Sequence, residues 1–282
     1  MYAIAGASGQ LGKLVLAEMI GRVGADRIVA LARDPAKLAD FALQGVTVRT
    51  ADYAKPETLA PALEGVERLL LISGNAVGQR VPQHKAVTAA AKAAGVGLIA
   101  YTSILHADTS TIGLAEEHRQ TEATLRESGV PFVLLRNGWY NENFTGALAP
   151  SIAHGAIIGA ASEGRISSAT RADYAAAAAI ALTSAKGGEV FELAGDNSFT
   201  MAQFAAAVST AAGKPVAYVD MAKDDYAKAL LGVGLPEVIA NMLADSSFES
   251  SKDQLFDDGR ALSAMVGRPT TPIADTIAKA LS

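Results

Sequence analysis

Three glycines near the start of the chain are spaced as G-x-x-G-x-x-G, in the segment "AGASGQLGK". This segment follows the apolar "MYAI" and precedes the helical pattern "LVLAEMI". A strand that breaks into glycines and then opens a helix gathers backbone N–H groups at the positive end of the helix dipole, which suits a pyrophosphate. Gly6 would make the tight turn, Gly9 would let the phosphates approach, and Gly12 would let the helix pack closely. An ordinary glycine-rich loop is the alternative, because a single motif of this kind is weakly specific.

Arg33 ends the expected second strand, in "LARDP", about 20 residues beyond the glycines, where an adenosine ribose would lie. Its planar guanidinium suits a ribose 2'-phosphate and can stack on adenine. Asp34 follows directly, and an acidic residue there would instead accept hydrogen bonds from the ribose hydroxyls of NAD. A solvated surface arginine is the alternative. We favour the phosphate role, and therefore NADPH over NADH.

Polar residues also follow the third and fourth expected strands, in "ADY" and "SGN". Asp52 can accept a bond from the adenine amino group, or it can cap the helix that follows. Ser73, Gly74 and Asn75 leave the fourth strand where a nicotinamide ribose would lie, and Gly74 would let the backbone approach. In the glycine segment, Ser8 and Gln10 can add side-chain donors.

The first half of the chain alternates strand-like and helix-like segments, which positions these residues at one sheet edge. The expected strands after "MYAI" are "RIVALAR", "VTVRTADY", "RLLLIS", "GLIAYTSI" and "PFVLLRNG", with helices between them. Six short strands separated by helices predict an α/β fold with a doubly wound parallel sheet of Rossmann-like type. The unbroken apolar runs suit strands that are covered on both faces.

After Gly138 the pattern loosens, which predicts a second, smaller α/β lobe. We expect a domain over 1–138 that binds the dinucleotide and an interleaved lobe over 139–282 that binds substrate. The segment "EVFELAG", residues 189–195, is expected to return to the main sheet as a strand, and "TMAQFAAAVSTAAGKPVAYVD" to form a helix and then a strand. The alanine-rich "ADYAAAAAIALTS" is too short for a membrane span and predicts a buried helix.

The charge, the absence of cysteine and the histidine spacing exclude several classes of function. The 282 residues carry 24 basic and 29 acidic side chains, a net charge of −5, with no basic run longer than a pair, which argues against a nucleic-acid surface. Cysteine is absent, so disulfides and Cys-based metal sites are excluded. With no signal-peptide pattern and no long apolar run, we expect a cytoplasmic protein without a membrane partner. No paired metal-ligand spacing joins the four histidines, His84, His106, His118 and His154, so no metal site is expected.

Together, the segments "GASGQLG", "LARDPAK", "VGQRVPQH", "AYTSILHADTS", "LLRNGWYNEN", "SATRADYAAAAA" and "LFDDG" resemble the short-chain dehydrogenase/reductase superfamily. The resemblance is to its atypical NmrA-like branch, and within it to the bacterial NADPH-dependent quinone oxidoreductases. It implies NADPH as cofactor and a quinone as substrate, and a homodimer is the one assembly that we consider. The implied cofactor contacts are Gly6, Ala7, Ser8, Gly9, Gln10, Leu11, Arg33, Ser73, Gly74, Asn75, Asn137, Gly138, Trp139, Tyr140, Asn141, Glu142 and Arg165.

The sequence departs from the superfamily at the helix after the fifth strand, where members typically carry Tyr-x-x-x-Lys. Here that helix offers His118 and Glu122, whose i, i+4 spacing places them on one helix face. His118 is therefore a candidate proton donor that Glu122 would orient. A structural pair is the alternative, and we favour it, so chemistry that converts alcohols to ketones is not expected.

Quinone reduction needs no dedicated acid, because hydride goes to an electrophilic acceptor and water can protonate the product. Positioning and water exclusion can supply most of the rate. Asn137 is a candidate for bonding the acceptor carbonyl or the nicotinamide carboxamide, while Trp139 and Tyr140 can form an aromatic wall. Tyr101 and Ser103 are further candidates for carbonyl contacts.

The expected function is therefore NADPH-dependent quinone reduction by direct hydride transfer, without a flavin. Two alternatives remain open at this point. One is a redox sensor of the NmrA type that binds NADP(H) without catalysis, which the missing Tyr-x-x-x-Lys motivates. The other is a reductase of bulky dyes or azo compounds.

Overall fold

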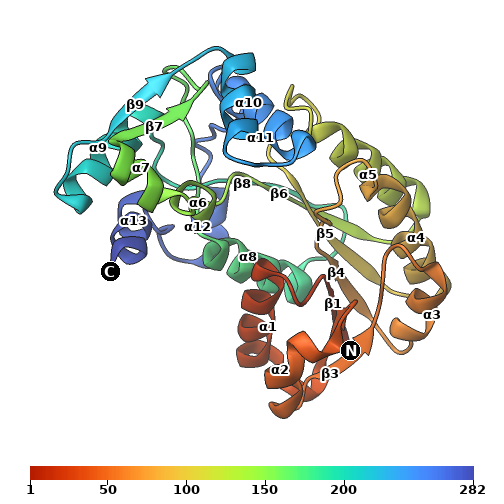
Figure 1. Ribbon diagram of the computed structural model, residues 1–282. Coiled ribbons are helices and arrows are strands. Elements are labelled where there is room, and N and C mark those ends of the chain that lie inside the picture. Colours follow the sequence, from red (N-terminus) through yellow and green to blue (C-terminus); the bar gives the residue numbers. More distant parts are fainter. The chain divides into compact units, whose positions relative to one another are not determined.

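The computed structural model describes residues 1–282 and contains a seven-stranded sheet in the order β3-β2-β1-β4-β5-β6-β8 (Figure 1). Strands β1 to β6 pair in parallel along this order. The strands are β1 (Tyr2–Ala5), β2 (Ile28–Ala32), β3 (Thr47–Thr50), β4 (Arg68–Leu71), β5 (Leu98–Ile104), β6 (Phe132–Asn137) and β8 (Val190–Leu193). The predicted doubly wound α/β fold is confirmed, and so is the return of 189–195 to the main sheet.

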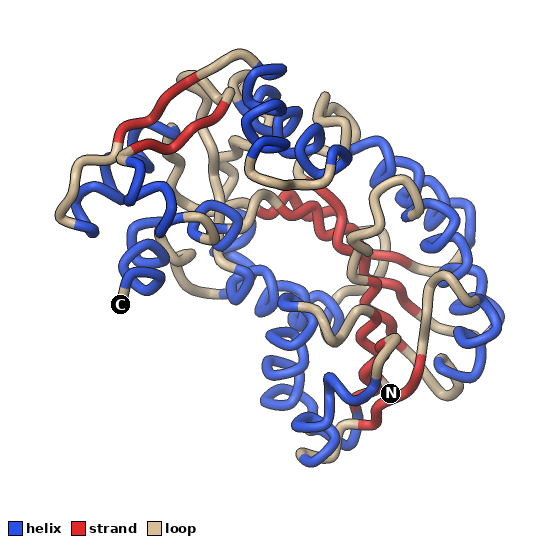
Figure 2. Tube along the Cα trace, in the orientation of Figure 1, coloured by secondary structure: helices blue, strands red, loops and turns tan.

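The strands of this sheet are buried because helices cover both of its faces. Every residue of β2 and β5 is buried, as their unbroken apolar runs predict. Helices α1 and α8 lie on one face, and α3, α4 and α5 lie on the other (Figures 1 and 2). These helices are α1 (Gln10–Val23), α3 (Leu59–Ala62), α4 (Arg80–Ala93), α5 (Ala115–Ser128) and α8 (Arg171–Ser184); short α2 (Ala39–Leu43) and the 3₁₀ turns Ala25–Arg27, Pro35–Leu38 and Pro56–Thr58 complete the set.

The chain order reverses between β1 and β4, which lie side by side in the sheet. From β1 the chain runs outward to β2 and β3, and then returns to β4 on the other side of β1. Ligands of open parallel sheets bind at the carboxyl ends of the strands at such a switch point. The glycine segment follows β1 and "SGN" follows β4, so both begin at this position.

The chain divides into two compact units. The first comprises Met1–Ala107, Glu117–Asn137 and Arg171–Phe191, and the second comprises Asp108–Glu116, Gly138–Thr170 and Glu192–Ser282. Helix α8 is the alanine-rich segment, and its burial in the first unit confirms the predicted buried helix. The expected C-terminal lobe, 139–282, includes α8, whereas the structure places this helix in the first unit. Its small side chains let it pack against α1.

The second unit is built around a two-stranded parallel sheet of β7 (Ala156–Gly159) and β9 (Ala217–Asp220). The predicted helix and strand over 200–220 are confirmed as α9 and β9, and Thr200 with Gln203 forms a capping box at the start of α9. The helices are α6 (Asn141–Thr145), α7 (Leu148–His154), α9 (Met201–Ala212), α10 (Lys223–Gly232), α11 (Glu237–Ser250), α12 (Ala261–Val266) and α13 (Ile273–Leu281). No helix of the chain has both the length and the apolar character that crossing a membrane requires.

Candidate active site

The glycine segment forms a tight turn whose backbone is closed against the start of α1. Gly6 has a φ of +76°, which only glycine adopts without strain, and the Gly9 N–H donates to the Gly6 carbonyl oxygen at 3.1 Å. A Cβ on Gly12 would lie 2.4 Å from the Gly6 carbonyl oxygen and 2.7 Å from the Ala7 Cα. Any side chain at position 12 would therefore displace the turn.

The first turn of α1 offers unused donors beside these glycines. Gly9 is the N-cap and makes no side-chain cap hydrogen bond, and the first turn contains no acidic residue. The first N–H groups of a helix have no partner within the helix, and the helix dipole favours an anion there. Gly9 and Gln10 are exposed, and Ser8 is half-buried. This turn fits the pyrophosphate of a dinucleotide.

Arg33 and Asp34, which left the cofactor choice open in the sequence, differ in their surroundings. The Asp34 carboxylate accepts the Ala36 N–H at 3.1 Å and caps the 3₁₀ turn that follows β2. Arg33 is exposed and has no partner within the chain. The acidic side chain is therefore committed to the backbone, while the guanidinium remains free to meet a phosphate.

The ends of β3 and β4 are held by hydrogen bonds within the first unit. Asp52 Oδ1 accepts the Ala54 N–H at 3.0 Å, which closes a local turn. It does not cap the 3₁₀ turn Pro56–Thr58, whose N-cap residue is Lys55, so the expected helix cap is not formed. The Gly74 N–H donates to His84 Nε2 at 3.2 Å, and Arg80 Nε donates to the Gly74 carbonyl oxygen at 2.5 Å. Two side chains of helix α4 thereby hold the backbone N–H and the backbone carbonyl of Gly74.

Ser73 is also fixed, through the neighbouring strand β5. The Ser73 N–H donates to Thr102 Oγ1 at 2.8 Å, and the hydroxyl of Thr102 donates to Ser73 Oγ at 3.3 Å. Asn75 is exposed, and its side chain makes no hydrogen bond within the chain. Asn75 is thus the member of this trio whose side chain is free for a ligand.

His118 is buried and bonded at both ring nitrogens. Its Nδ1 lies 2.8 Å from Tyr101 Oη, and its Nε2 lies 3.4 Å from an Nη of Arg80. A guanidinium can only donate, so Nε2 accepts and Nδ1 carries the proton. Burial, with the positive charge of Arg80, holds the pKa of His118 well below its usual value. His118 is therefore neutral near pH 7.

Glu122 does not orient His118, which corrects that expectation. Its carboxylate accepts from Arg136 Nε at 3.0 Å and from an Nη of Arg136 at 2.9 Å, and the hydroxyl of Ser103 donates to it at 2.7 Å. Arg126 adds a bond at 3.1 Å. Burial opposes ionisation of Glu122, but these hydrogen bonds outweigh it and leave the pKa below its usual value. The shared helix face does not bring the pair together because each side chain has a better partner on a strand.

Replacing His118 with asparagine tests whether this histidine acts as an acid. Because the ring is neutral and enclosed, we expect a modest loss of turnover and a decrease of roughly 0.5 to 3 kcal/mol in the free energy of unfolding. Thermal unfolding and single-turnover NADPH oxidation measure the two effects. A general acid would contribute about 100-fold or more to the rate. A well-folded variant whose hydride step had collapsed would show that His118 is catalytic.

Asn137 ends β6 at the same edge of the sheet and carries an unused acceptor. Its side chain is 6% exposed, and its Oδ1 makes no hydrogen bond within the chain. A buried amide oxygen without a partner is costly, so such an atom marks a place where a ligand donor can bind. A nicotinamide carboxamide supplies such a donor, and Asn137 therefore fits the cofactor.

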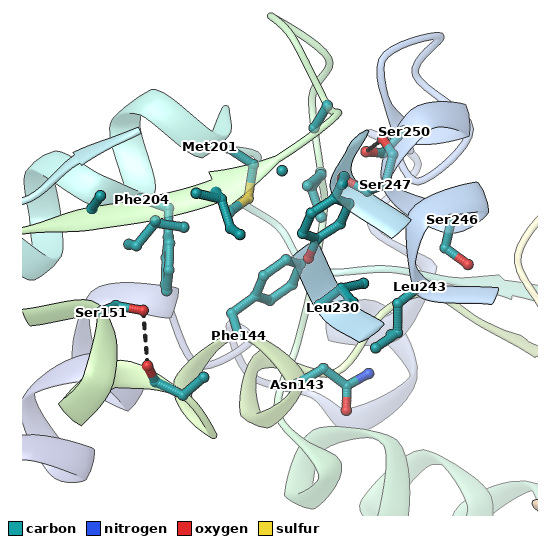
Figure 3. A pocket seen from close by; sticks show the side chains of 18 of the residues that line it. Asn143, Phe144, Ser151, Met201, Phe204, Leu230, Leu243, Ser246, Ser247 and Ser250 are labelled. Carbon is teal, nitrogen blue, oxygen red and sulfur yellow. Dashed lines mark hydrogen bonds between the residues drawn. The ribbon is translucent and has the colours of Figure 1, made fainter. Parts of the chain in front are cut away.

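In the second unit, Trp139 lines a cavity of about 540 Å³, whereas Asn141 is not among the lining residues. Figure 3 shows this cavity from close by. Asn141 is fully buried; its Nδ2 donates to Thr276 Oγ1 at 2.9 Å, and its Oδ1 accepts from Ser168 Oγ at 2.6 Å. These bonds tie α6 to its neighbours and occupy both ends of the Asn141 amide. Gly138 is buried, and Tyr140 and Glu142 are half-buried.

Arg165 belongs to an ion pair in the second unit. It donates to Asp253 Oδ2 from Nε at 3.1 Å and from an Nη at 2.6 Å, and its guanidinium lies 3.6 Å from the ring centroid of Phe256. This is the surface ion pair that is the simplest alternative to a cofactor contact. About half of the side chain remains exposed, at 49%.

Sequence reasoning missed Arg80, His84 and Arg136, which build the buried polar cluster of the first unit. His84 Nδ1 also lies 3.0 Å from Thr121 Oγ1, and burial together with Arg80 lowers the pKa of His84 to about 4. The signal was present in "VGQRVPQH", because Arg80 and His84 are four residues apart and share a helix face. Arg136 had no such local signal, since its partner Glu122 lies on another element.

The comparisons with known proteins concern nearly the whole chain. Residues 6–185 match the family model described as NAD(P)H-binding. The chain is 53% identical over 278 residues to quinone oxidoreductase 2 of Escherichia coli, covering 98% of this chain and 97% of that protein.

Solved structures with bound cofactor share the fold. The crystal structure of the Escherichia coli NADPH-dependent quinone oxidoreductase in complex with NADPH has a TM-score of 0.98 at 52% identity and covers 100% of both chains. The triphenylmethane reductase of Citrobacter sp. in complex with NADP(H) has a TM-score of 0.94 at 34% identity, covering 99% of this chain and 100% of that chain.

Proposed function

Because this chain belongs to the NAD(P)H-binding family, in its NmrA-like branch, we propose that it oxidises NADPH and reduces quinones by direct hydride transfer without a flavin. The observation that carries the proposal is the 53% identity, over 98% of this chain, to a quinone oxidoreductase. NADPH supplies a hydride from C4 of its nicotinamide, and a quinone that gains this hydride and one proton becomes a hydroquinone.

The residues of the first unit have the groups that NADPH requires. The turn of Gly6 to Gly12 and the free N–H groups of α1 would hold the pyrophosphate. Arg33 would pair with the 2'-phosphate, since Asp34 is committed to the backbone. Asn137 Oδ1 would accept a bond from the carboxamide.

Proton supply does not require a side chain of the buried cluster. His118 is neutral and enclosed by Tyr101 and Arg80, so it is poorly placed to donate. The chain instead contributes by orienting the reactants, and after the hydride has been transferred the hydroquinone anion takes its proton from solvent.

Replacing Arg33 with alanine tests the cofactor preference. We expect NADPH binding to weaken by about 1.5 to 3 kcal/mol, the range for a hydrogen bond to a charged group, whereas NADH binding stays nearly unchanged. Calorimetric titration of both nucleotides measures the difference. The exposed position of Arg33 makes a folding defect in this variant unexpected. Equal losses for NADPH and NADH would remove Arg33 from the 2'-phosphate.

A second candidate, reduction of triphenylmethane dyes, is favoured by the likeness to the Citrobacter reductase at 34% identity. A panel of benzoquinones, naphthoquinones, azo compounds and triphenylmethane dyes, each assayed with NADPH, separates the two functions. We expect quinones to be turned over fastest, by purified protein that shows no flavin absorbance. Turnover of dyes without turnover of any quinone would favour the second candidate instead.

A further inference from the structure

The cavity of the second unit is too large to be a packing defect. Its volume is about 540 Å³, and α6, α7, α9, α10, α11 and β7 all contribute to its walls. Protein interiors contain few voids larger than a water molecule, whereas ligand pockets range from about 300 to 1,000 Å³. Figure 3 shows Phe144 of α6 between Phe204 on one side and Leu230 and Leu243 on the other. The cavity therefore has the size of a ligand site.

The walls of this cavity accept an uncharged, apolar ligand. None of the lining residues is Asp, Glu, Lys or Arg, and most are apolar; the polar ones besides the serines are Asn143, His154 and Tyr226. Four serines line it, but each is already bonded to the main chain, so their hydroxyls do not require a polar ligand. The bonds join Ser151 Oγ to the Ala147 carbonyl oxygen (2.8 Å), Ser246 Oγ to the Met242 carbonyl oxygen (2.9 Å), Ser250 Oγ to the Ser247 carbonyl oxygen (2.6 Å) and the Ala160 N–H to Ser247 Oγ (2.9 Å).

The apolar lining continues out to the protein surface. Ile158 of β7 and Val233, directly after α10, both line the cavity and are 37% and 73% exposed. An apolar ligand longer than the cavity would therefore still contact apolar side chains where it leaves. We expect a quinone ring without a substituent to contact neither Ile158 nor Val233. These two exposed apolar residues at the cavity favour an extended substituent.

One residue of the cavity wall, Trp139, is close in sequence to Asn137. Trp139 lines the cavity and lies two residues after Asn137, which ends β6 with its unpaired amide oxygen. Two residues span at most about 7 Å of backbone. The backbone of the cavity-lining residue Trp139 therefore begins within about that length of chain from Asn137.

We propose that the cavity binds the aliphatic side chain of the quinone, so that the favoured substrates are quinones with an alkyl or prenyl chain. This inference rests on the proposed function, because it assigns the acceptor of that reaction. It also separates quinones from cationic dyes, whose charge would find no acidic partner among the lining residues. The aliphatic chain, rather than the ring, then accounts for much of the binding.

A series of acceptors with one ring and different chains tests the proposal. The same dimethoxy-methyl-benzoquinone ring is assayed with no chain and with n-alkyl chains of increasing length. We expect KM for the quinone to fall about fourfold for each methylene until the cavity is filled, which corresponds to about 0.8 kcal/mol per methylene. A KM that does not depend on chain length would overturn the inference while leaving quinone reduction intact.

Two neighbouring leucines of α10 provide a matched pair of variants. Leu230 lines the cavity, whereas Leu231 does not line it and is 42% exposed. Leu230→Glu places a carboxylate in the apolar walls and is expected to abolish most of the gain from chain length. Leu231→Glu places the same charge on the same helix and is expected to retain that gain. Equal chain-length dependence in both variants would contradict the assignment.

A binding measurement without turnover separates the inference from the proposed function. Trp139 is the single tryptophan of the chain, so its fluorescence reports on the cavity. Titration with 1-decanol, a chain without a ring, is expected to shift the Trp139 emission in wild type and Leu231→Glu, and not in Leu230→Glu. A shift without NADPH oxidation by any quinone would overturn the function but keep the apolar site. Quinone turnover without a shift would keep the function and overturn the apolar site.

Discussion

Replacing Gly12 with alanine is expected to weaken NADPH binding about tenfold or more, which corresponds to about 1.4 kcal/mol. The same change is expected to lower the free energy of unfolding by roughly 1 to 3 kcal/mol, as overpacking does. The new Cβ would lie 2.4 Å from the Gly6 carbonyl oxygen and 2.8 Å from the Ala7 carbonyl carbon, so backbone must move. Calorimetric titration and urea unfolding measure the two losses.

Gly21 provides the matched control for this change, because it lies on the same helix, α1. A Cβ at position 21 would meet no atom within 4 Å. Gly21→Ala is therefore expected to leave NADPH binding unchanged and to stabilise the protein by about 0.5 to 1 kcal/mol. If Gly12→Ala bound NADPH as tightly as this control, the turn would not be the pyrophosphate site.

Replacing Glu122 with glutamine is expected to lower the free energy of unfolding by about 3 kcal/mol or more. Glu122 and Arg136 are 1% and 4% exposed, so the substitution leaves a buried guanidinium without its counter-charge. Asp225→Asn is the control, since the Asp225–Lys228 pair is exposed and its loss should cost less than about 1 kcal/mol. Chemical unfolding of both variants measures the difference. Losses of equal size would show that the buried pair contributes no more than a surface pair.

The contribution of Glu122 also has a defined pH dependence. Its pKa in the folded protein lies below its unfolded value, so the folded state holds fewer protons in the acid range. The stabilisation is therefore complete above the unfolded pKa and is lost as the pH falls through the folded one. The stability difference between wild type and Glu122→Gln should shrink on acidification. A difference that stayed constant from neutral to acid pH would contradict this assignment.

Local signals in the sequence were sufficient to predict the sheet, the glycine turn and the returning strand. Strands covered on both faces require unbroken apolar runs, and a turn with positive φ at Gly6 requires glycine, so both constraints are visible in the residue types. Arg33 and Asn137 were placed at the carboxyl ends of strands because each lies where an apolar run of the sequence ends. These features depend on neighbours in the chain.

The partners of the buried polar side chains could not be predicted in the same way. Helical spacing placed His118 and Glu122 on one face, but Tyr101 and Arg136 on adjacent strands bind them separately. The side-chain amide of Asn141, which was expected to contact the cofactor, donates a hydrogen bond to Thr276, 135 residues further along the chain. Such pairings depend on which elements pack together, and no local pattern encodes that choice.

A single-turnover measurement tests direct hydride transfer to a quinone most directly. Protein loaded with one equivalent of NADPH is mixed rapidly with an alkyl-substituted benzoquinone, and the loss of nicotinamide absorbance is followed with NADPH and with NADPH deuterated at the transferred position. We expect loss much faster than for free NADPH with the same quinone, slower loss with the deuterated cofactor, and no flavin absorbance at any time. Loss at the rate of free NADPH would contradict this expectation.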